Sequence, residues 1–277
     1  MKLSNILIEA RATLSKANIE EPLRESKLLI CHALNCSLEI FFLDSEKKIS
    51  LLVKKKIFKL ISRRAKGEPF AYITNSISFY KNNFYINNKV LIPRPETEEL
   101  IEKVLKNIPN KNKNINILDI GTGSGVILAS LLQELPNSSG IGTDISIDAL
   151  KVAKINLTNL NIFRRSKLVN TNWSQGIRTN IFDIVTCNPP YIDNKNIKNL
   201  PKEIKEWKYV ELLILNYNLL TTLPKEIGQL KKLQTLYSYM AILPSINSKK
   251  RLGLVSRVYT FVRCIQLTKL DNCFWII

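Results

Sequence analysis

The amino-acid sequence predicts an α/β protein in which a small helical N-terminal domain precedes a Rossmann-like parallel sheet. Residues 1–66 carry apolar side chains at helical spacing, whereas from residue 115 onward short apolar strands alternate with helical segments. A glycine-rich turn, Gly121 to Gly125, follows one of these strands. Strands separated by helices pair in parallel and form a sheet between two layers of helices. The predicted divisions are a helical domain at 1–66, a β-hairpin linker at 67–95, a ligand-binding α/β domain at 96–196 and a C-terminal segment at 197–277.

The helical domain is indicated by apolar residues that recur every three or four positions. Ile6, Ala10 and Leu14 form one such series, which is typical of a helix with one buried face. Pro22 follows two glutamates, and because proline is tolerated in a first turn, a helix is expected to begin there. The linker after this domain alternates apolar residues with Asn and Ser, which predicts a short hairpin. Its apolar members are Tyr72, Ile73, Phe79, Tyr80, Phe84, Tyr85 and Ile86, and Pro93 and Pro95 close it.

The α/β domain is expected to contain strands and helices in alternation after a first helix over 96–107. Apolar runs bounded by Gly, Asn and Asp predict the strands, and amphipathic stretches between them predict the helices. The expected strands lie at 115–120, 140–143, 167–170 and 182–187, and the expected helices run from the glycine turn to Leu132 and from Ile147 to Leu157.

The C-terminal segment carries a repeat that the preceding part lacks. The pentapeptide Leu-Pro-Lys-Glu-Ile at 200–204 recurs unchanged at 223–227, an offset of 23 residues. Leucines at repeat spacing follow each copy, so the region from 200 to 237 resembles one and a half leucine-rich repeats. A solenoid normally needs three or more repeats to bury its core. The tail after Tyr237 continues neither pattern.

Composition narrows the class of protein. The net charge of +18 raises the possibility of proximity to RNA or the ribosome, although the lysines are spread along the chain and also suit an ordinary solvated surface. No apolar stretch reaches the roughly 20 residues of a membrane span, so no membrane partner and a cytoplasmic location are expected. The five cysteines show no metal-ligand spacing, and His32 is the only histidine. No metal site is therefore expected.

The glycine turn and the strand after it predict a nucleoside-binding site. Glycine lets the backbone turn sharply and approach a ligand closely, and the helix behind the turn presents free N–H groups. Asp144 ends the next strand, about 20 residues on, where a carboxylate can accept hydrogen bonds from ribose hydroxyls. The turn is one residue tighter than the G-x-G-x-x-G of dinucleotide sites. A tighter turn suits a methionine-derived cofactor, which carries no phosphate.

Asn188, Pro189, Pro190 and Tyr191 follow the strand at 182–187, where ligands bind in open α/β sheets. The prolines lack N–H donors and stiffen the segment, so the acceptors that remain are the side-chain oxygen of Asn188 and the carbonyl of Pro189. Two fixed acceptors can hold both N–H bonds of a planar amino group and aim its nitrogen at a methyl donor. This predicts methylation of an amide or aromatic amine.

These motifs together resemble the glutamine N5-methyltransferases of peptide-chain release factors. Asn-Pro-Pro-Tyr alone is shared with DNA adenine methyltransferases, and the segment Leu-Ile-Pro-Arg-Pro-Glu-Thr-Glu at 91–98 narrows the resemblance to the first family. The helical domain and the segment 67–73 also resemble that family, so the similarity covers residues 4 to 195. It implies a class I, Rossmann-like methyltransferase fold with S-adenosyl-L-methionine as cofactor.

The resemblance also implies roles for individual residues. The glutamine of a Gly-Gly-Gln tip would be held at 188–191, with Asn188, Pro189 and Tyr191 as the catalytic residues and Pro190 as a further substrate contact. The helical domain would dock the release factor. The residues that would bind the cofactor, with Trp173 flanking the adenine, are Gly121, Thr122, Gly123, Ser124, Gly125, Asp144, Trp173 and Asn188.

The C-terminal segment departs from that family, whose sheet continues after the strand at 182–187. We therefore expect an incomplete sheet in which this strand forms an exposed apolar edge. The hypothesis is a fusion or decayed gene product, a methyltransferase front with a foreign C-terminus, in which the altered C-terminus puts activity in question. Two other functions stay open at this point. The leucine-rich segment would serve a protein-interaction module, and the basic charge would suit an adenine N6-type methyltransferase of nucleic acid.

Overall fold

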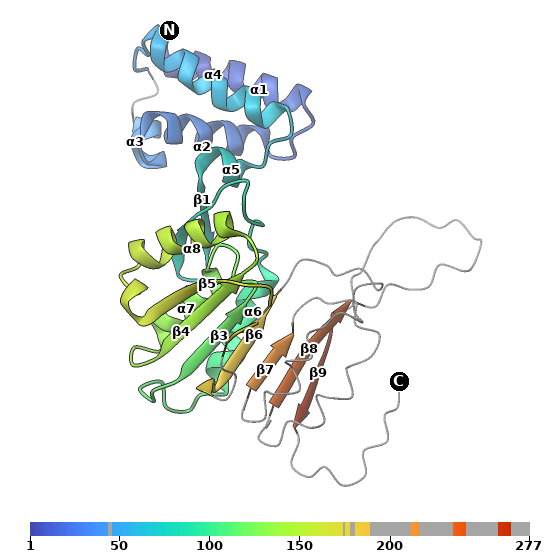
Figure 1. Cartoon of the computed structure of the whole chain (residues 1–277). Helices are drawn as coiled ribbons and strands as arrows, with labels where there is room; N and C mark the ends of the chain where they lie inside the picture. Colours follow the sequence, from blue (N-terminus) through green and yellow to red (C-terminus); the bar gives the residue numbers. More distant parts are fainter. Residues whose placement is uncertain are drawn as a thin grey trace, which may run out of the picture. The chain divides into compact units, whose positions relative to one another are not determined.

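The computed structural model divides the chain into two compact units. The helical unit comprises residues 1–77 and 86–88, and the sheet unit comprises residues 78–85 and 89–277 (Figure 1). The structure describes residues 1–43, 46–173, 175–177 and 181–188, together with the backbone of three further strands at 212–215, 235–241 and 260–266. Within the described residues, no helix is both long and apolar enough to cross a bilayer.

The helical unit forms because each of its longer helices buries one apolar face. Ile6, Ala10 and Leu14 on the first helix are fully buried, as their spacing predicts. The second helix begins at Pro22 and ends at Asn35, whose φ of 53° is left-handed. Burial of these faces against one another gives the unit its core. Its helices are α1 (Leu3–Lys16), α2 (Pro22–Leu34), α3 (Leu38–Leu43), α4 (Leu51–Ala65) and α5 (Phe70–Thr74).

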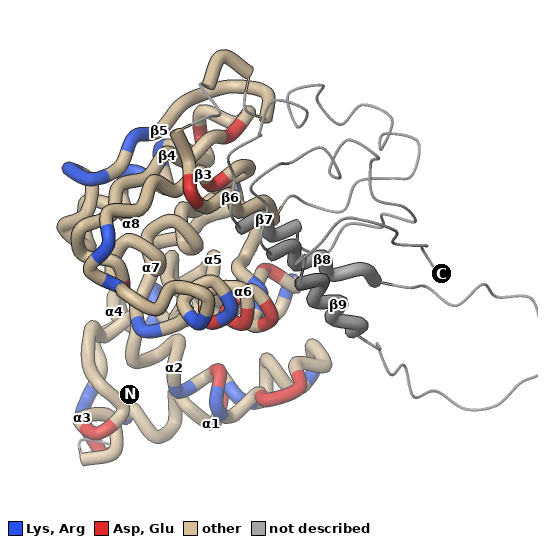
Figure 2. The backbone as a smooth tube through the Cα atoms, turned by 90° about the horizontal axis from the view of Figure 1, so that it is seen from below, with Lys and Arg blue, Asp and Glu red and all other residues tan. Residues whose placement is uncertain are grey.

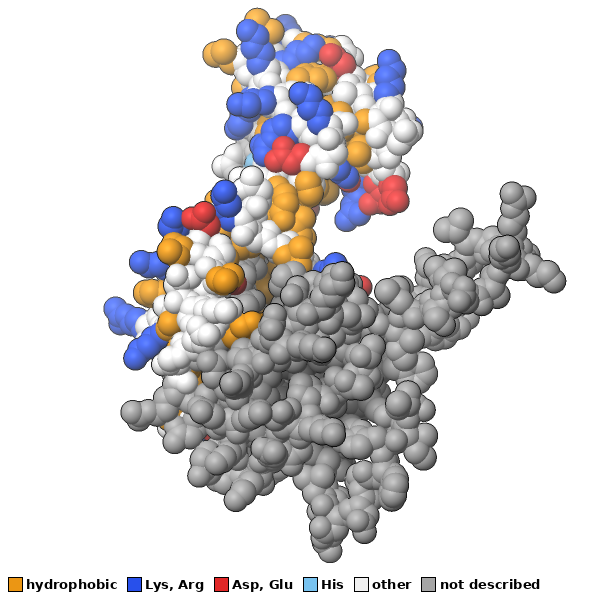
Figure 3. Space-filling view, turned by 45° about the vertical axis from the view of Figure 1, so that its right-hand side comes forward, with side chains coloured by type: hydrophobic (Ala, Val, Ile, Leu, Met, Phe, Trp, Pro, Cys, Tyr) orange, Lys and Arg blue, Asp and Glu red, His pale blue; other side chains and the backbone are white. Residues whose placement is uncertain are grey.

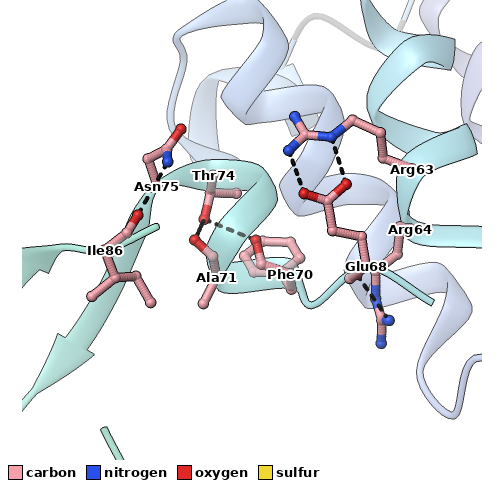
Figure 4. Close-up of polar contacts among 8 residues, drawn as sticks. All are labelled: Arg63, Arg64, Glu68, Phe70, Ala71, Thr74, Asn75 and Ile86. Atoms are coloured by element: carbon pink, nitrogen blue, oxygen red, sulfur yellow. Dashed lines mark hydrogen bonds and ion pairs between the residues drawn. The ribbon is translucent and has the colours of Figure 1, made fainter. Parts of the chain in front are cut away.

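Charged side chains fix the end of α4, and a helix follows (Figure 4). Arg63 Nε donates to Glu68 Oε2 at 2.7 Å, and Arg64 Nη1 donates to the Glu68 carbonyl at 3.3 Å. The chain then forms α5, so Tyr72 and Ile73 are helical rather than part of the expected hairpin. Alternation alone could not distinguish one helical turn from a strand.

The hairpin itself is confined to β1 (Ser76–Phe79) and β2 (Asn82–Tyr85). The sheet unit continues with the helices and strands that the sequence predicts, within a few residues at each end. They are α6 (Glu96–Lys106), β3 (Asn116–Ile120), α7 (Val126–Glu134), β4 (Ser139–Asp144), α8 (Ile147–Asn159), a 3₁₀ turn (Phe163–Arg165), β5 (Ser166–Asn170) and β6 (Ile184–Cys187).

The sheet has the order β5-β4-β3-β6-β7-β8-β9, in which β7 is Leu212–Leu215, β8 is Thr235–Ala241 and β9 is Thr260–Gln266. All neighbouring pairs are parallel except β8 and β9. Helix α7 contacts β3 and β4, and α8 contacts β4 and β5. This is the Rossmann-like arrangement that the alternation of strands and helices predicts.

The expectation that β6 would be an exposed edge is wrong. β6 lies between β3 and β7, with Ile184 opposite Leu212. The apolar run Leu-Leu-Ile-Leu at 212–215 supplies the missing neighbour, since four consecutive apolar residues suit a strand buried in a parallel sheet. The pair β7 and β8 joins Leu212 to Thr235, which lies 23 positions later, as do the two copies of Leu-Pro-Lys-Glu-Ile.

Candidate active site

Four features singled out in the sequence lie at one edge of the sheet. The glycine turn follows β3, Asp144 ends β4, Trp173 follows β5 and Asn188 follows β6. These four strands are neighbours and run parallel, so their carboxyl ends meet at the same edge. The structure therefore brings the predicted cofactor residues and Asn188 to one place. Pro189, Pro190 and Tyr191 lie outside the described residues.

The glycine turn has one open position and one closed position. Gly121, Gly123 and Gly125 all have positive φ, between 56° and 77°, a conformation that favours glycine. A Cβ on Gly123 would meet nothing nearer than the Gly121 carbonyl at 3.9 Å. A Cβ on Gly125 would lie 3.0 Å from Cβ of Ala153 on α8. Gly125 thus lets two helices pack, whereas Gly123 leaves backbone accessible to a ligand.

The Asp144 carboxylate is held against this turn. Its Oδ2 atom accepts a hydrogen bond from Gly123 N at 2.9 Å, and its Oδ1 atom accepts one from Ser146 N, also at 2.9 Å. Ser146 in turn caps α8 by accepting from Ala149 N. Each carboxylate oxygen retains a lone pair for another donor. The half-buried group is therefore fixed and still able to accept from ligand hydroxyls.

A second carboxylate, Asp119, lies beneath the turn, and the sequence did not identify it as a site residue. It is 1% exposed and accepts hydrogen bonds from the hydroxyls of Thr122 at 2.6 Å and Thr186 at 2.7 Å. Burial raises its pKa to about 6, although both hydroxyls oppose that shift. Because Thr122 belongs to the turn and Thr186 to β6, Asp119 joins the predicted cofactor loop to the strand that carries Asn188.

Asn188 contacts α6, the helix that begins within the Pro-Glu-Thr-Glu segment. Its Nδ2 atom donates to Thr97 Oγ1 at 3.3 Å. Thr97 lies in the first turn of α6 and is 2% exposed. The two residues are 91 positions apart, so sequence spacing could not reveal the contact.

Trp173 lies in the loop after β5 and has a φ of 58°. Left-handed backbone is uncommon for a bulky residue, and such conformations cluster at functional sites. The ring is partly exposed. Asn170 steadies the start of this loop by donating through Nδ2 to the carbonyls of Asp144 and Ile145 at 3.0 and 2.9 Å. The Trp173 loop is therefore tied to the residue that ends β4.

Asn156 on α8 is a further buried residue that the sequence did not identify. Its Nδ2 atom donates to the carbonyls of Ser124 and Tyr85 at 2.8 and 2.9 Å. Its Oδ1 atom accepts from Tyr85 N at 2.7 Å. All three bonds are to backbone, so Asn156 fixes the glycine turn to the end of β2. A lone asparagine in an amphipathic helix gives no signal of this role in the sequence.

The arrangement combines a backbone turn, a carboxylate and a carboxamide at one edge. The turn and Asp144 suit a ligand with donor hydroxyls, and the carboxamide suits a planar amino or amide group. Within the described ranges, no cluster of His, Cys, Asp and Glu could hold a metal ion.

Two family models match the chain. The first, described as the PrmC N-terminal domain, matches residues 5–74. The second, described as the methyltransferase small domain, matches residues 97–205. Together they cover the helical unit and the part of the sheet unit that carries the glycine turn and Asn188.

Similar proteins fall into two groups. A bifunctional methyltransferase of Rickettsia typhi is 37% identical over 209 residues, which is 69% of this chain and 40% of that protein. The chain thus spans about two fifths of the length of such relatives. Release factor glutamine methyltransferases of Buchnera aphidicola and Caulobacter vibrioides are 39% and 34% identical, over 68% and 71% of this chain and 67% and 68% of theirs. Among solved structures, the human methyltransferase 10 domain containing protein is 18% identical with a TM-score of 0.41, over 59% of this chain and 71% of that chain.

Proposed function

Because the chain belongs to the release factor glutamine methyltransferase family, we propose that it methylates N5 of a glutamine side chain, with S-adenosylmethionine as methyl donor. The glutamine is that of the Gly-Gly-Gln motif of a release factor. One observation carries the proposal: Asn188 lies at the same edge of the sheet as the glycine turn and Asp144. A carboxamide that can hold an amide is thereby placed beside a site that can hold a nucleoside.

The residues of the cofactor site fit S-adenosylmethionine. Gly123 has open space where a side chain would stand, so the methionine part can approach the backbone. Asp144 is fixed by two backbone N–H groups and offers acceptors for ribose hydroxyls. Thr122, Ser124 and Gly125 shape the turn from the buried side. Trp173 presents an aromatic face for the adenine.

Methyl transfer to an amide nitrogen depends more on how the amide is oriented than on general acid or base catalysis. When bound, S-adenosylmethionine supplies an electrophilic methyl group. The lone pair of an amide nitrogen is delocalised, so the protein must hold the amide in place and aim that nitrogen. Asn188 and Pro189 would accept its two N–H bonds, and Tyr191 would border it. The nitrogen would gain one N–C bond as the bond between the methyl carbon and the donor sulfur breaks, with the electron pair of that bond staying on sulfur. The nitrogen would then release one proton to water, so no strong base is needed.

Binding and transfer are tested separately on the full chain. Calorimetric titration with S-adenosylmethionine should show saturable binding, and Asp144→Ala should weaken it by about tenfold or more, since a charged hydrogen-bond partner is lost. Asp148→Ala is the matched control, because this carboxylate pairs with Lys151 at the surface of α8.

Purified release factor with radiolabelled donor should gain one methyl group on glutamine. A release factor in which that glutamine is replaced should gain none, and methylation of nucleic acid instead would contradict the proposal.

The helical unit is proposed to dock the release factor through α4 and the end of α3. Leu43, Leu51 and Leu52 are 88%, 69% and 79% exposed, and Lys55 and Lys59 follow at helical spacing on α4. Figure 3 shows hydrophobic and basic side chains interspersed on the helical unit. Such a surface fits a partner that presents apolar and acidic side chains.

Substitution of this surface tests the docking proposal. Leu52→Asp combined with Lys55→Glu should raise KM for the release factor by about tenfold, because apolar contact and charge attraction are both lost. The affinity for S-adenosylmethionine should not change. Lys16→Glu, an exposed residue at the end of α1, is the control. An unchanged KM in the double variant would show that docking uses another surface.

The protein is also proposed to lie close to RNA at the ribosome, because its net charge is +18. Lys and Arg occur on helices of both units (Figure 2). Binding of ribosomes or of a nonspecific RNA should therefore weaken steeply as salt increases. Affinity that does not respond to salt would contradict it.

A cytoplasmic location is also proposed, since release factors act where translation occurs, and cell fractionation tests it.

Leucine-rich repeat character is proposed for residues 200–237. The parallel register of β7 and β8 supports it, because stacked repeats pair each strand with the equivalent strand of the next unit. Proline at position 214 of β7 should disrupt both pairings of that strand, and hydrogen exchange of β6 and β8 would report the loss.

A further inference from the structure

We propose that Thr97 is a positioning residue that holds the Asn188 carboxamide in place, with its amino group toward α6. The inference rests on the proposed function, in which the Asn188 oxygen accepts from the amide to be methylated. It assigns a role to a buried threonine of the Pro-Glu-Thr-Glu segment through a contact made 91 residues further along the chain.

The geometry places the amino side of the carboxamide against α6. Asn188 Nδ2 lies 3.3 Å from Thr97 Oγ1, and Thr97 is almost completely buried. A carboxamide is planar, so its oxygen then faces away from the threonine hydroxyl. None of the described residues donates to Asn188 Oδ1. In this part of the chain the oxygen is thus the acceptor that is left for a ligand, while the nitrogen is engaged by Thr97.

Orientation matters because the two ends of the carboxamide have opposite roles. A substrate amide that presents N–H bonds needs an acceptor, and Asn188 presents one only when its oxygen points to the site. That orientation turns Nδ2 toward buried α6. Without the Thr97 hydroxyl, Nδ2 would be left unsatisfied, and burying an unpaired amide donor is unfavourable. The hydroxyl therefore holds the carboxamide in the orientation in which its oxygen is left to accept from the substrate amide.

The strand that precedes Asn188 is anchored as well. Thr186, two residues earlier, donates to the buried Asp119 carboxylate at 2.7 Å. The backbone of β6 is therefore fixed independently of Thr97. A change at Thr97 should alter the side-chain orientation of Asn188 and leave its backbone in place.

The kinetic test compares isosteric substitutions of buried threonines. Thr97→Val removes the acceptor at constant shape and should lower kcat for methyl transfer by about tenfold to hundredfold. The affinity for S-adenosylmethionine should stay within about twofold, since the Asp144 site is untouched. Thr97→Ser keeps the hydroxyl and should restore most of the rate. Thr143→Val is the control, because Thr143 is fully buried on β4 and its hydroxyl has no partner among the described residues.

Equal losses in the Ser and Val variants at position 97 would overturn the proposal, because they would indicate a packing role. So would a Val variant as active as the native chain. A fall in the Thr143→Val control as large as that at Thr97 would also overturn it.

A second readout does not depend on activity. Solvent exchange of the Asn188 side-chain amide protons, assigned by NMR through Asn188→Asp, should be slow in the native chain and in Thr97→Ser. It should be at least about tenfold faster in Thr97→Val. Native exchange as fast as that of an exposed asparagine would overturn the proposal without any variant. If the native chain transfers no methyl group, the proposed function fails, while this exchange experiment still decides the role of Thr97.

Discussion

The described ion pairs of the helical unit are all partly exposed, whereas the sheet unit has surface ion pairs and, in addition, pairs polar groups in its interior. Arg63 and Glu68 are 38% and 35% exposed in their ion pair, but Asp119 and Asn156 are each 1% exposed. The helical unit therefore relies on its apolar core, and its outer face is free to serve binding. In the sheet unit, a few buried hydrogen bonds fix the positions of the glycine turn and β6.

The largest expected contrast comes from removing one buried amide. Asn156→Ala leaves the backbone groups of Tyr85 and Ser124 unpaired and should destabilise the sheet unit by about 4 kcal/mol. Arg63→Ala should destabilise the helical unit by less than about 1 kcal/mol, since partly exposed ion pairs contribute little. Hydrogen exchange with mass spectrometry of peptides from each unit measures both. Asn159→Ala, at the exposed end of α8, is the control, and equal losses at the two asparagines would refute the contrast.

The buried carboxylate should give the sheet unit a pH dependence opposite in sign to that of Glu68 in the helical unit, whose pKa is lowered by its hydrogen bond to Arg63. The pKa of Asp119 is raised from 3.8 to about 6. Between these values the folded state holds a proton that the unfolded chain has lost, so the free energy of unfolding falls as pH rises from about 4 to about 6. The fall is about 3 kcal/mol, and above pH 6 this contribution is constant.

Asp119→Asn isolates this effect, because the other carboxyl groups are the same in both proteins. The native-minus-variant difference in the stability of the sheet unit should decline across that pH window. A difference that is flat from pH 4 to pH 7 would show that Asp119 titrates at its ordinary pKa.

Two glycines with positive φ allow the stability cost of backbone strain to be distinguished from the cost of close packing. Gly67 in the helical unit has a φ of 89° and open space around it, whereas Gly125 has a φ of 77° and Ala153 at 3.0 Å. Gly67→Ala should cost about 1 kcal/mol through its backbone alone. Gly125→Ala should cost about 2 to 3 kcal/mol, because α7 and α8 must also move apart. Urea titration followed by hydrogen exchange would measure both costs. Equal costs would mean that α7 and α8 can move apart without loss of stability.

The smallest contrast is expected for two buried hydroxyls, whose removal should have the same effect in both units. Ser26 in the helical unit and Thr143 in the sheet unit each bury a hydroxyl that has no partner among the described residues. Ser26→Ala and Thr143→Val should each stabilise their unit by about 1 kcal/mol, since an unpaired polar atom is removed. Destabilisation of either unit, measured in the same exchange experiment, would indicate an unseen partner for that hydroxyl.

Local signals predicted most of the fold. The strands at β3 to β6 and the helices between them follow from apolar runs and from Gly, Asn and Asp at their ends, which act within a few residues. Helix α5 was missed because Tyr72 and Ile73 favour strands by local preference, while burial of Ile73 in the core of the helical unit and the left-handed Asn75 that ends the turn decide otherwise. The neighbour of β6 was missed because strand pairing depends on residues that lie 28 positions away, Ile184 and Leu212.

The candidate site was predictable where it depends on backbone turns and strand ends. Residue type and position at the end of a predicted strand were enough to identify Gly121 to Gly125, Asp144 and Asn188 as candidates. The sequence does not reveal Thr97, Asn156 and Asp119, because each has a contact with a residue 32 to 91 positions away that defines its role. Nothing in their immediate sequence distinguishes them from an ordinary helix cap, helix polar residue or strand end.

The pairing of β7 with β8 at an interval of 23 residues sets a rule for which length changes this chain can absorb. A duplication of one 23-residue copy between the two strands would add a strand that pairs in the same parallel register with β7 and with β8. An insertion of an odd number of residues within a strand would instead move each following side chain of that strand to the other face of the sheet. A length difference of 23 residues between related chains would therefore mark the gain or loss of one strand at this place.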